Sequence, residues 1–553
     1  MKKIFALIVA VASVAAVVNS CSNKQFEELY PDPSKTSVAT CDKLFTGTLI
    51  AGNQNTFNSY WRMYTWDNYF GKLAQTIGFS NNSGSVYYIN DGYANDRWNN
   101  YYDVLRNFRV LQDVYSKDND AENKLFVDLA EIFMLDHATQ LVDIWGDIPF
   151  SEACYLGITF DVASSYAAYD TGAEVYKYAL NRLDEIYSEL TSIKSNISST
   201  LQAKLTKQDF INKGDLDKWL RYCNTLMLRL GVHVSAQGSL VSEGKAAVAK
   251  AAGRLLVDSI DNEIDVYSDN DGFQIASRDS WKDINNTASQ AIIDAMQITG
   301  VNDPRLPVIY VPTKNDYAGG EDADDKAYSA GEYFGRSTSE TDNQQTVRNG
   351  SNHNTEATRY YARLNGVTFT SNSFMVSPII TAAEAWFLLA EAYQQGYASG
   401  GSAETAFKKG IVESAKFYYK ANIESDQTRL SLYSDQADDF RATATPSDSE
   451  LETFAASVWN AYSNKLEGIM TQKWVHFGIM QATQAWTDIR RTGYPALYYP
   501  KDGADNNGYP TVTQRVKYPN SEATNNAANY ATAAANCGND SAYSVLFYAK
   551  EVK

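Results

Sequence analysis

The apolar residues of this chain recur at helical spacing in one segment after another, and this periodicity constrains its fold more than any other feature. Within residues 125–145, Phe126, Phe133, His137 and Leu141 lie on one face of a helix. Comparable stripes occupy residues 175–190, 216–234 and 475–489. Because each stripe must be buried against another element, the helices have to pack together in layers. We therefore predict a mostly α-helical fold with long irregular loops and a few short strands.

The helical pair in residues 381–410 carries the most specific repeat signal. Thr381 and Glu384 are spaced as a capping box, which starts a helix. The residues that match the tetratricopeptide signature across the two helices are Trp386, Leu389, Ala390, Tyr393, Ala403, Phe407 and Gly410. One such hairpin cannot bury its own apolar face, so we predict a scaffold of several tetratricopeptide-like hairpins. An ordinary helical hairpin is the alternative.

The helical stripes also predict the setting of several polar side chains. His137 falls within an apolar stripe and is expected to be a hydrogen-bonded core residue, and Cys223 is expected to be buried. Asp215 precedes a stripe and is a plausible N-cap. Arg490 and Arg491 close the last stripe, where paired cations would complement the helix dipole.

The first twenty residues have the composition of an export signal. Lys2 and Lys3 precede an apolar run over residues 4–18, which is shorter than the roughly 20 residues that span a bilayer. Val18-Asn19-Ser20-Cys21 then has the form of a lipobox. We predict that residues 1–20 are a lipoprotein signal peptide and that Cys21 is diacylated. The alternative is an ordinary signal peptide with a cysteine near its cleavage site by chance.

The segment after Cys21 is polar and contains Pro31 and Pro33. Residues 21–40 are therefore expected to form an extended tether, and residues 41–553 a single domain. No other stretch approaches 18 uninterrupted apolar residues, so only the lipid would hold the protein on a membrane.

The charge and the motif content of the chain exclude several functions. The formal net charge is −18 at pH 7, and loss of the signal peptide with Lys2 and Lys3 makes the chain more acidic still. Such a chain repels nucleic acid, so no nucleic-acid partner is expected. The sequence contains no GxSxG, P-loop or HExxH motif, and we predict neither catalytic residues nor a cofactor.

Metal binding is not predicted either. The segment Asp269-Asn270-Asp271-Gly272 lacks the first Asp and the closing Glu of an EF-hand loop, so solvated acidic loops are the favoured interpretation there and in residues 319–325. The remaining cysteines are widely scattered, without zinc-like spacing, and are Cys41, Cys154, Cys223 and Cys537. Whether they form disulfides or stay as buried thiols is left open.

Eight short motifs follow one another along nearly the whole mature chain. They occupy residues 26–33, 98–102, 145–150, 218–230, 383–392, 472–474, 486–495 and 515–525. Among them are Trp145-Gly146-Asp147-Ile148-Pro149-Phe150 and a segment that ends in Arg490-Arg491-Thr492-Gly493-Tyr494-Pro495. Their order and spacing resemble the SusD/RagB-like nutrient-binding outer-membrane lipoproteins of Bacteroidetes, in the subgroup called SusD-like 2.

This resemblance implies a function for the chain. The protein would be lipid-anchored in the outer membrane, facing the extracellular side, and would bind a nutrient without cleaving it. It would pass that nutrient to a partner SusC-like TonB-dependent transporter. We expect an oligosaccharide as the ligand. The alternatives are a peptide ligand in the same system, a tetratricopeptide-type scaffold for protein partners, and a surface-anchored hydrolase.

Aromatic residues make up 13% of the chain, and some of them lie in polar, Gly- and Asn-rich sequence. Exposed rings of this kind can stack on sugar rings, because they offer an apolar face and order at low entropic cost. The candidate ligand-binding residues are Trp66, Tyr69, Tyr87, Tyr88, Tyr328, Tyr333 and Phe334. The alternative is that these rings pack beneath their own loops.

Replacement of Cys21 by Ala tests the predicted lipid anchor. Without the acylated cysteine, no acyl chains would hold the protein on the membrane, so the variant is expected to leave the outer-membrane fraction. Fractionation of cells followed by immunoblotting measures this. An unchanged outer-membrane level of the variant would contradict the prediction.

Overall fold

Most of the chain after the predicted tether is described by the structure, which is a computed structural model. The described residues are 39–57, 59–78, 86–266, 287–316, 327–339, 360–372, 375–426, 439–501 and 507–553. The predicted signal peptide, Cys21 and the tether up to residue 38 lie outside them, as do the acidic segments 269–272 and 319–325. Predictions about those segments stay predictions.

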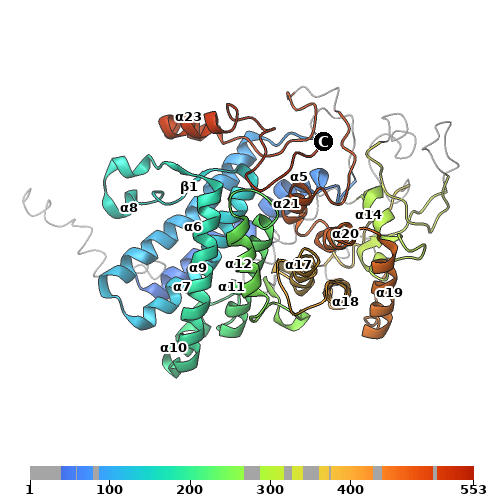
Figure 1. Ribbon diagram of the computed structural model, residues 1–553, viewed down its shortest axis with the longest axis horizontal. Helices are drawn as coiled ribbons and strands as arrows, with labels where there is room; N and C mark the ends of the chain where they lie inside the picture. The colour runs from blue at the N-terminus through green and yellow to red at the C-terminus, as the bar shows by residue number, and fades with distance from the viewer. Residues whose placement is uncertain are drawn as a thin grey trace, which may run out of the picture.

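Long helices form the body of the molecule, and Figure 1 shows them side by side across its length. In chain order they are α3 (Cys41–Ala51), α6 (Asp91–Asp118), α7 (Ala121–Trp145), α9 (Gly172–Asn196), α11 (Leu216–Val234), α12 (Val241–Ala251), α17 (Ala382–Gln394), α18 (Ala403–Ile423), α19 (Asp448–Ala461), α20 (Lys465–Phe477) and α21 (Ala482–Thr492). No described helix has the length and apolar content needed to cross a membrane. The predicted α-helical, tetratricopeptide-like fold is confirmed.

Short helices and strand pairs connect the long helices. The short helices are α4 (Asn53–Thr56), η1 (Tyr60–Asp67), α5 (Asn68–Leu73), α8 (Leu156–Thr159), η2 (Val162–Ser165), α10 (Ser199–Gln208), η3 (Ile260–Asn262), α14 (Gln290–Met296), α15 (Leu306–Ile309), α22 (Asn520–Asn525) and α23 (Ala527–Asn536). The antiparallel strand pairs are β1 (Ile148–Pro149) with β2 (Tyr169–Asp170), β3 (Ile264–Val266) with β6 (Ser377–Ile380), and β4 (Tyr310–Val311) with β5 (Arg363–Leu364).

Local sequence explains where the helices begin and end. The Asp120 carboxylate accepts from the N–H of Glu122 at the start of α7, and Asp215 caps α11 as predicted. Thr171 and Glu174 form a full capping box on α9. Gly146 stops α7 with a φ of +89°, a conformation that side chains with a Cβ rarely adopt.

Glycines allow paired helices to approach closely. In the pair α17–α18, a Cβ placed on Gly410 would come within 2.7 Å of the Phe387 ring. In the pair α11–α12, a Cβ on Gly244 would lie 2.8 Å from the carbonyl oxygen of Gly231. The tetratricopeptide-type spacing of small and aromatic residues predicted for residues 381–410 is thus seen in the packing.

The structure corrects two details of the sequence interpretation. The Thr381 hydroxyl accepts from the N–H of Glu384, but the Glu384 carboxylate pairs with Arg229 of α11 instead of closing a capping box. The apolar stripe over residues 475–489 is divided between α20 and α21, because Gly478 takes a φ of +45°. Arg490 and Arg491 lie in the last turn of α21, as predicted, and both are buried.

Buried arginine–carboxylate pairs join helices that are distant in sequence. Arg229 of α11 binds Glu384 of α17 through Nε–Oε1 (2.5 Å) and Nη2–Oε2 (2.8 Å). Arg491 of α21 binds Glu391 of α17, with 2.8 Å from Nη2 to Oε2. These four side chains are almost fully excluded from solvent. Each therefore depends on its partner, because an uncompensated buried charge is strongly destabilising.

Asp488 of α21 extends this group of charges. Its carboxylate accepts from Lys473 Nζ of α20 at 2.9 Å and from Arg491 Nη2 at 2.7 Å. Burial alone would raise the pKa of Asp488, but Lys473 and Arg491 hold that pKa well below its usual value. The carboxylate therefore stays charged at neutral pH, and α17, α20 and α21 are locked to one another.

Replacement of Glu391 by Gln tests the role of these pairs. The change leaves Arg491 buried with less negative charge, so the free energy of unfolding is expected to fall by about 3–5 kcal/mol. Glu404→Gln is the matched control, because Glu404 pairs with Lys408 on the surface of α18. Its cost should stay below about 0.5 kcal/mol. Chemical denaturation measures both, and equal losses would contradict the prediction.

Candidate functional site

Several chain segments that are far apart in sequence meet at residues 287–290. The N–H of Gly78 donates to the carbonyl oxygen of Thr287 (2.8 Å), and the N–H of Arg336 donates to that of Ala288 (2.8 Å). The N–H of Ala288 donates in turn to Ala362 (2.9 Å). The structure thus joins the two sequence regions that contain the candidate ligand-binding aromatics.

Glycines allow this junction to be tight. A Cβ on Gly78 would lie 2.7 Å from the carbonyl oxygen of Ala288, and a Cβ on Gly335 would lie 2.4 Å from Ser289. Both distances are too short for any other residue, so the segments can approach only where glycine stands. The junction is therefore a fixed base for the side chains around it.

Four of the seven predicted aromatic residues are buried, which are Tyr328 of the second region and three residues of the first. Trp66, Tyr69 and Tyr87 are buried, so the expectation that they are exposed is wrong. Trp66 stacks on Phe70 and meets Trp145 edge-on, with ring centroids 5.7 Å apart in both cases. η1 and α5 carry these rings inward, where their large apolar surfaces gain more from burial than from exposure.

The second predicted region forms an aromatic stack. Tyr328 and Phe334 lie 4.4 Å apart with nearly parallel planes, and Phe334 also faces Tyr361. The Arg336 guanidinium lies 5.1 Å from the centre of the Tyr361 ring. Tyr328 is buried, whereas Tyr333 and Phe334 are partly exposed. Phe334 of this stack, its neighbour Tyr333 and the Arg336 side chain are therefore partly exposed to solvent.

Of the four predicted aromatics of the first region, Tyr88 alone reaches the surface. It is partly exposed and packs against Tyr509, with ring centroids 5.7 Å apart. Lys517 Nζ lies 5.5 Å from the centre of the Tyr509 ring. Tyr88, Tyr333 and Phe334 thus remain available for ligand contact, which stays a prediction.

Tyr498 is an exposed aromatic residue that the sequence interpretation missed. Its side chain is 63% exposed, while the neighbouring Tyr499 is buried. Gln75 donates to the Tyr498 carbonyl oxygen (2.7 Å), and Thr338 donates to the same oxygen (3.4 Å). Tyr498 and Tyr499 lie in an irregular segment without helical or strand periodicity, so the sequence does not show which of the two rings is exposed.

The segment around Tyr498 links both predicted regions. The Tyr87 hydroxyl donates to the carbonyl oxygen of Pro500 (2.5 Å), and the Tyr499 hydroxyl donates to that of Leu73 (2.8 Å). Thr338 approaches the same segment from the side of the aromatic stack. We name the exposed or partly exposed rings carried by the segments that are joined here the aromatic surface; they are Tyr88, Tyr333, Phe334, Tyr498 and Tyr509. Rings held on hydrogen-bonded backbone can stack on a ligand with little loss of entropy.

A separate concavity of about 220 Å³ lies beside β1 and β2. It is lined by Arg109, Phe150, Ser151, Asp170, Glu174 and Tyr178. Next to it, α8 and η2 leave an apolar group exposed, which is Leu156, Phe160, Val162 and Tyr166. The concavity is smaller than the roughly 300 Å³ of a typical small-molecule site. It offers no stacked pair of exposed rings.

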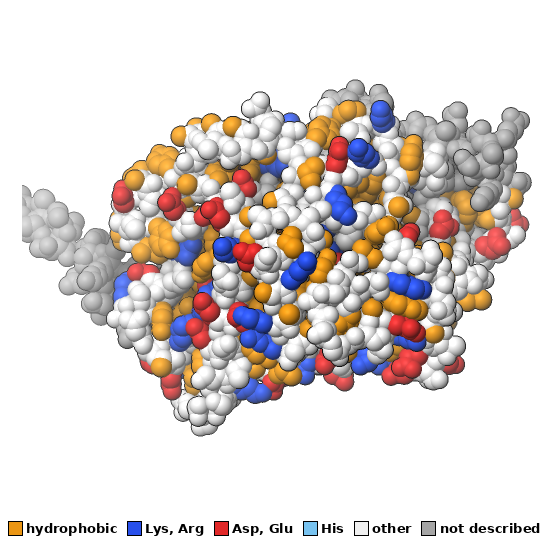
Figure 2. Space-filling view, in the orientation of Figure 1, with side chains coloured by type: hydrophobic (Ala, Val, Ile, Leu, Met, Phe, Trp, Pro, Cys, Tyr) orange, Lys and Arg blue, Asp and Glu red, His pale blue; other side chains and the backbone are white. Residues whose placement is uncertain are grey.

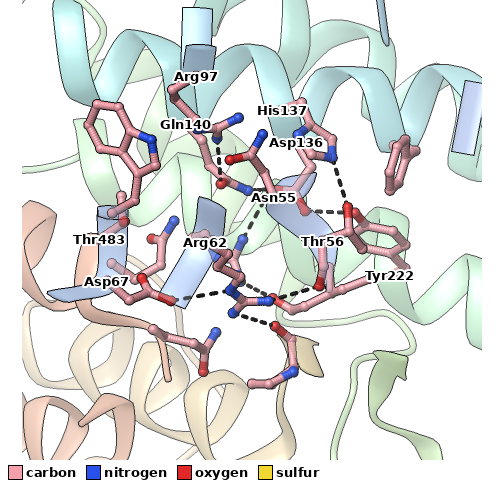
Figure 3. A pocket seen from close by; sticks show the side chains of 17 residues that line it. Asn55, Thr56, Arg62, Asp67, Arg97, Asp136, His137, Gln140, Tyr222 and Thr483 are labelled. Carbon is pink, nitrogen blue, oxygen red and sulfur yellow. Dashed lines mark hydrogen bonds and ion pairs between the residues drawn. The ribbon is translucent and has the colours of Figure 1, made fainter. Parts of the chain in front are cut away.

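A smaller polar cavity of about 60 Å³ lies between α6, α7, η1 and α21 (Figure 3). Arg62, Asp67, Arg97, Asp136 and His137 are among the side chains that line it. Burial raises the pKa of Asp67 to about 7, against the opposing effect of Arg62. The cavity is too small to admit a sugar ring.

The described histidines and cysteines take structural positions. His137 is buried in the core as predicted, and its Nε2 lies 3.2 Å from the Thr56 hydroxyl. Burial lowers the pKa of His476 to about 3. Among the described residues, Cys41, Cys154, Cys223 and Cys537 form no disulfide, and Cys223 is buried as predicted. Within the described ranges, no group of three or more His, Cys, Asp or Glu residues could hold a metal ion.

Charges on the visible surface are mixed. Figure 2 shows acidic and basic side chains scattered over this face without a continuous basic stripe. A nucleic-acid-binding face would gather its cations along one groove or helix. The face in Figure 2 has no such feature.

Solved structures with the same fold are found at low sequence identity. A chitin-binding protein is 22% identical, with a TM-score of 0.69, over 92% of this chain and 100% of its own. A chitin-binding SusD homologue from Flavobacterium johnsoniae is 21% identical, with a TM-score of 0.65, over 91% and 98%. A SusD-like protein from Bacteroides thetaiotaomicron is 21% identical, with a TM-score of 0.63, over 92% and 99%. At these identities the likeness shows the fold alone.

A family comparison identifies the chain more specifically. No curated protein matches it. The family model SusD-like 2, described as starch-binding and associating with the outer membrane, matches residues 33–519. This match covers most of the chain and includes six of the eight motifs in full, together with the last residue of the first motif and residues 515–519 of the last. The chain therefore belongs to the SusD-like 2 family of starch-binding proteins that associate with the outer membrane.

Proposed function

We propose that this protein binds an oligosaccharide at the cell surface through the aromatic surface and delivers it to a SusC-like TonB-dependent transporter. Tyr498 is the observation that carries the proposal, because its ring is largely exposed while its backbone is held by Gln75 and Thr338. An exposed ring on a fixed backbone can cover the apolar C–H face of a sugar. Exposure of an apolar ring to water does not itself stabilise the fold.

Two further observations support a carbohydrate ligand. The family is described as starch-binding, and two of the solved structures with this fold carry the name chitin-binding. Arg336 and Lys517 lie beside rings of the aromatic surface or its supporting stack, and their N–H groups can donate to sugar hydroxyl oxygens. We favour oligomers of glucose or of an aminosugar, as in starch and chitin, as the ligand class.

We also propose that the protein does not cleave its ligand. Glycoside hydrolysis needs two carboxyl groups about 5–10 Å apart on either side of the scissile bond. The five rings that define the aromatic surface carry no carboxyl group, and the charges beside them include the cations Arg336 and Lys517 as well as the carboxylates of Asp91 and Asp540, which act on Tyr509. Binding through these rings, followed by transfer, needs no catalytic pair of carboxyl groups.

The proposed transporter partnership and lipid anchor act together. Diacylation of Cys21 would keep the protein on the membrane, so a transporter in the same membrane would be met at high effective concentration. The outer-membrane association in the family description supports this arrangement. A ligand held on exposed rings, instead of in a closed pocket, could be released to the transporter without a large opening motion.

Calorimetry with Tyr498→Ala tests the proposed ligand site. The panel is chitin-derived, starch-derived and host-derived oligosaccharides, with acidic peptides as the alternative ligand class. At least one oligosaccharide should bind the native protein, and the variant should bind it about tenfold more weakly, which corresponds to about 1.4 kcal/mol. Tyr166→Ala is the matched control, since Tyr166 is also exposed but lies beside η2. It should bind as the native protein does.

The same samples separate the alternatives. Binding of a peptide but of no oligosaccharide would replace the proposed ligand class. Equal affinity of Tyr498→Ala and Tyr166→Ala would place the site elsewhere. Appearance of shortened oligosaccharides after prolonged incubation would overturn the non-enzymatic function.

A further inference from the structure

The polar cavity between α6, α7, η1 and α21 contains the guanidinium of Arg97, which Asp67 and Asp136 influence electrostatically but with which no described carboxylate forms an ion pair. Arg97 of α6 is 4% exposed and lines the cavity. Its Nη2 donates to Gln140 Oε1 at 3.3 Å, and its Nη1 has no hydrogen-bond partner. Within the described ranges, none of the ion pairs involves Arg97. A buried guanidinium left in this state is costly, because its charge and its donor both lose water.

The neighbouring arginines are fully engaged. Arg62 donates from Nε to Asp67 and from its other four N–H positions to Thr56, Ser377, Pro378 and Met480. Arg229 binds Glu384 and also approaches Asp136 Oδ1 at 3.4 Å. The carboxylates that line the cavity thus already form ion pairs with other arginines, and Arg97 is the lining arginine that has none.

The start of α21 adds further positive potential. Gln481, Thr483 and Gln484, at the first turn of this helix, line the cavity. The N–H of Thr483 donates to the Asp67 carboxylate, although burial raises the pKa of Asp67 to about 7. A helix N-terminus carries about half a positive charge and favours anions. Arg97 and the N-terminus of α21 therefore both contribute positive electrostatic potential to the cavity.

His137 defines a second position in the cavity. The Thr56 hydroxyl donates to the carbonyl oxygen of Gly52 (2.9 Å), so His137 Nε2 must carry the proton that it shares with Thr56. Nδ1 is then a bare acceptor, and it has no partner. Burial lowers the pKa of His137 well below its usual value, so the ring is neutral. A water molecule in the cavity can donate a hydrogen bond to this nitrogen.

We propose that the cavity binds one monatomic anion, chloride in ordinary media, with Arg97 Nη1 as its principal donor and a water molecule between the ion and His137. The volume of about 60 Å³ accommodates several water-sized particles but no sugar. Three guanidinium groups and a helix N-terminus exclude a metal cation from the same space. The ion would neutralise Arg97 and so hold α6 against α7 and α21.

Halide dependence of stability tests this site. The purified protein is dialysed into sodium gluconate, and sodium chloride or bromide then replaces gluconate at constant ionic strength. Chloride and bromide should raise Tm along a saturating curve, because a ligand that binds only the folded state stabilises it. Arg97→Met should lose this increment. Arg106→Met, an exposed change on the same helix, should retain it.

Crystals grown in bromide provide a readout that does not depend on a variant. An anomalous peak beside Arg97 Nη1 is the expected result. Water at that position, with no halide-specific change in Tm, would overturn the proposal, as would a full halide increment in Arg97→Met. If Arg97→Met fails to fold, the bromide peak and the native titration decide between these outcomes. Neither result depends on oligosaccharide binding.

Discussion

Buried arginine–carboxylate pairs between helices are the interactions on which the rest of this structure depends. Glu384 and Glu391, about two helical turns apart on α17, bind Arg229 of α11 and Arg491 of α21. Each pair is nearly solvent-free, so a shift of one helix by a turn would strand a charge in the core. The pairs therefore select one arrangement of α11, α17, α20 and α21 among those that simple apolar packing would allow.

The scaffold made in this way supports a small exposed surface. η1 and α5 carry the buried rings of Trp66 and Tyr69, and beyond them residues 75–78, 287–290 and 498–500 are joined by backbone hydrogen bonds and side-chain donors. Tyr498 stands on this base with its ring in solvent. A binding surface benefits from exposed rings on a rigid backbone, because ligand binding then costs little conformational entropy.

Sequence patterns predicted the fold well because helix periodicity, caps and glycine positions are local signals. Residues 125–145 and the cap at Asp215 are examples. The sequence motifs contain Arg229, Glu384 and Arg491, but their ion pairs could not be predicted, because each partner is distant in sequence. The candidate site was predicted less well. Burial of Trp66 and exposure of Tyr498 depend on tertiary packing, which neither composition nor spacing encodes.

Hydrogen–deuterium exchange tests the central claim, that ligand binds the aromatic surface while the helical scaffold stays unchanged. The experiment compares the free protein with the protein saturated by the tightest-binding oligosaccharide of a chitin, starch and host-glycan panel. Slower exchange is expected in residues 86–90, 333–338 and 494–501, with α17, α20 and α21 unaffected. Protection confined to other segments, or altered exchange throughout those three helices, would contradict the account.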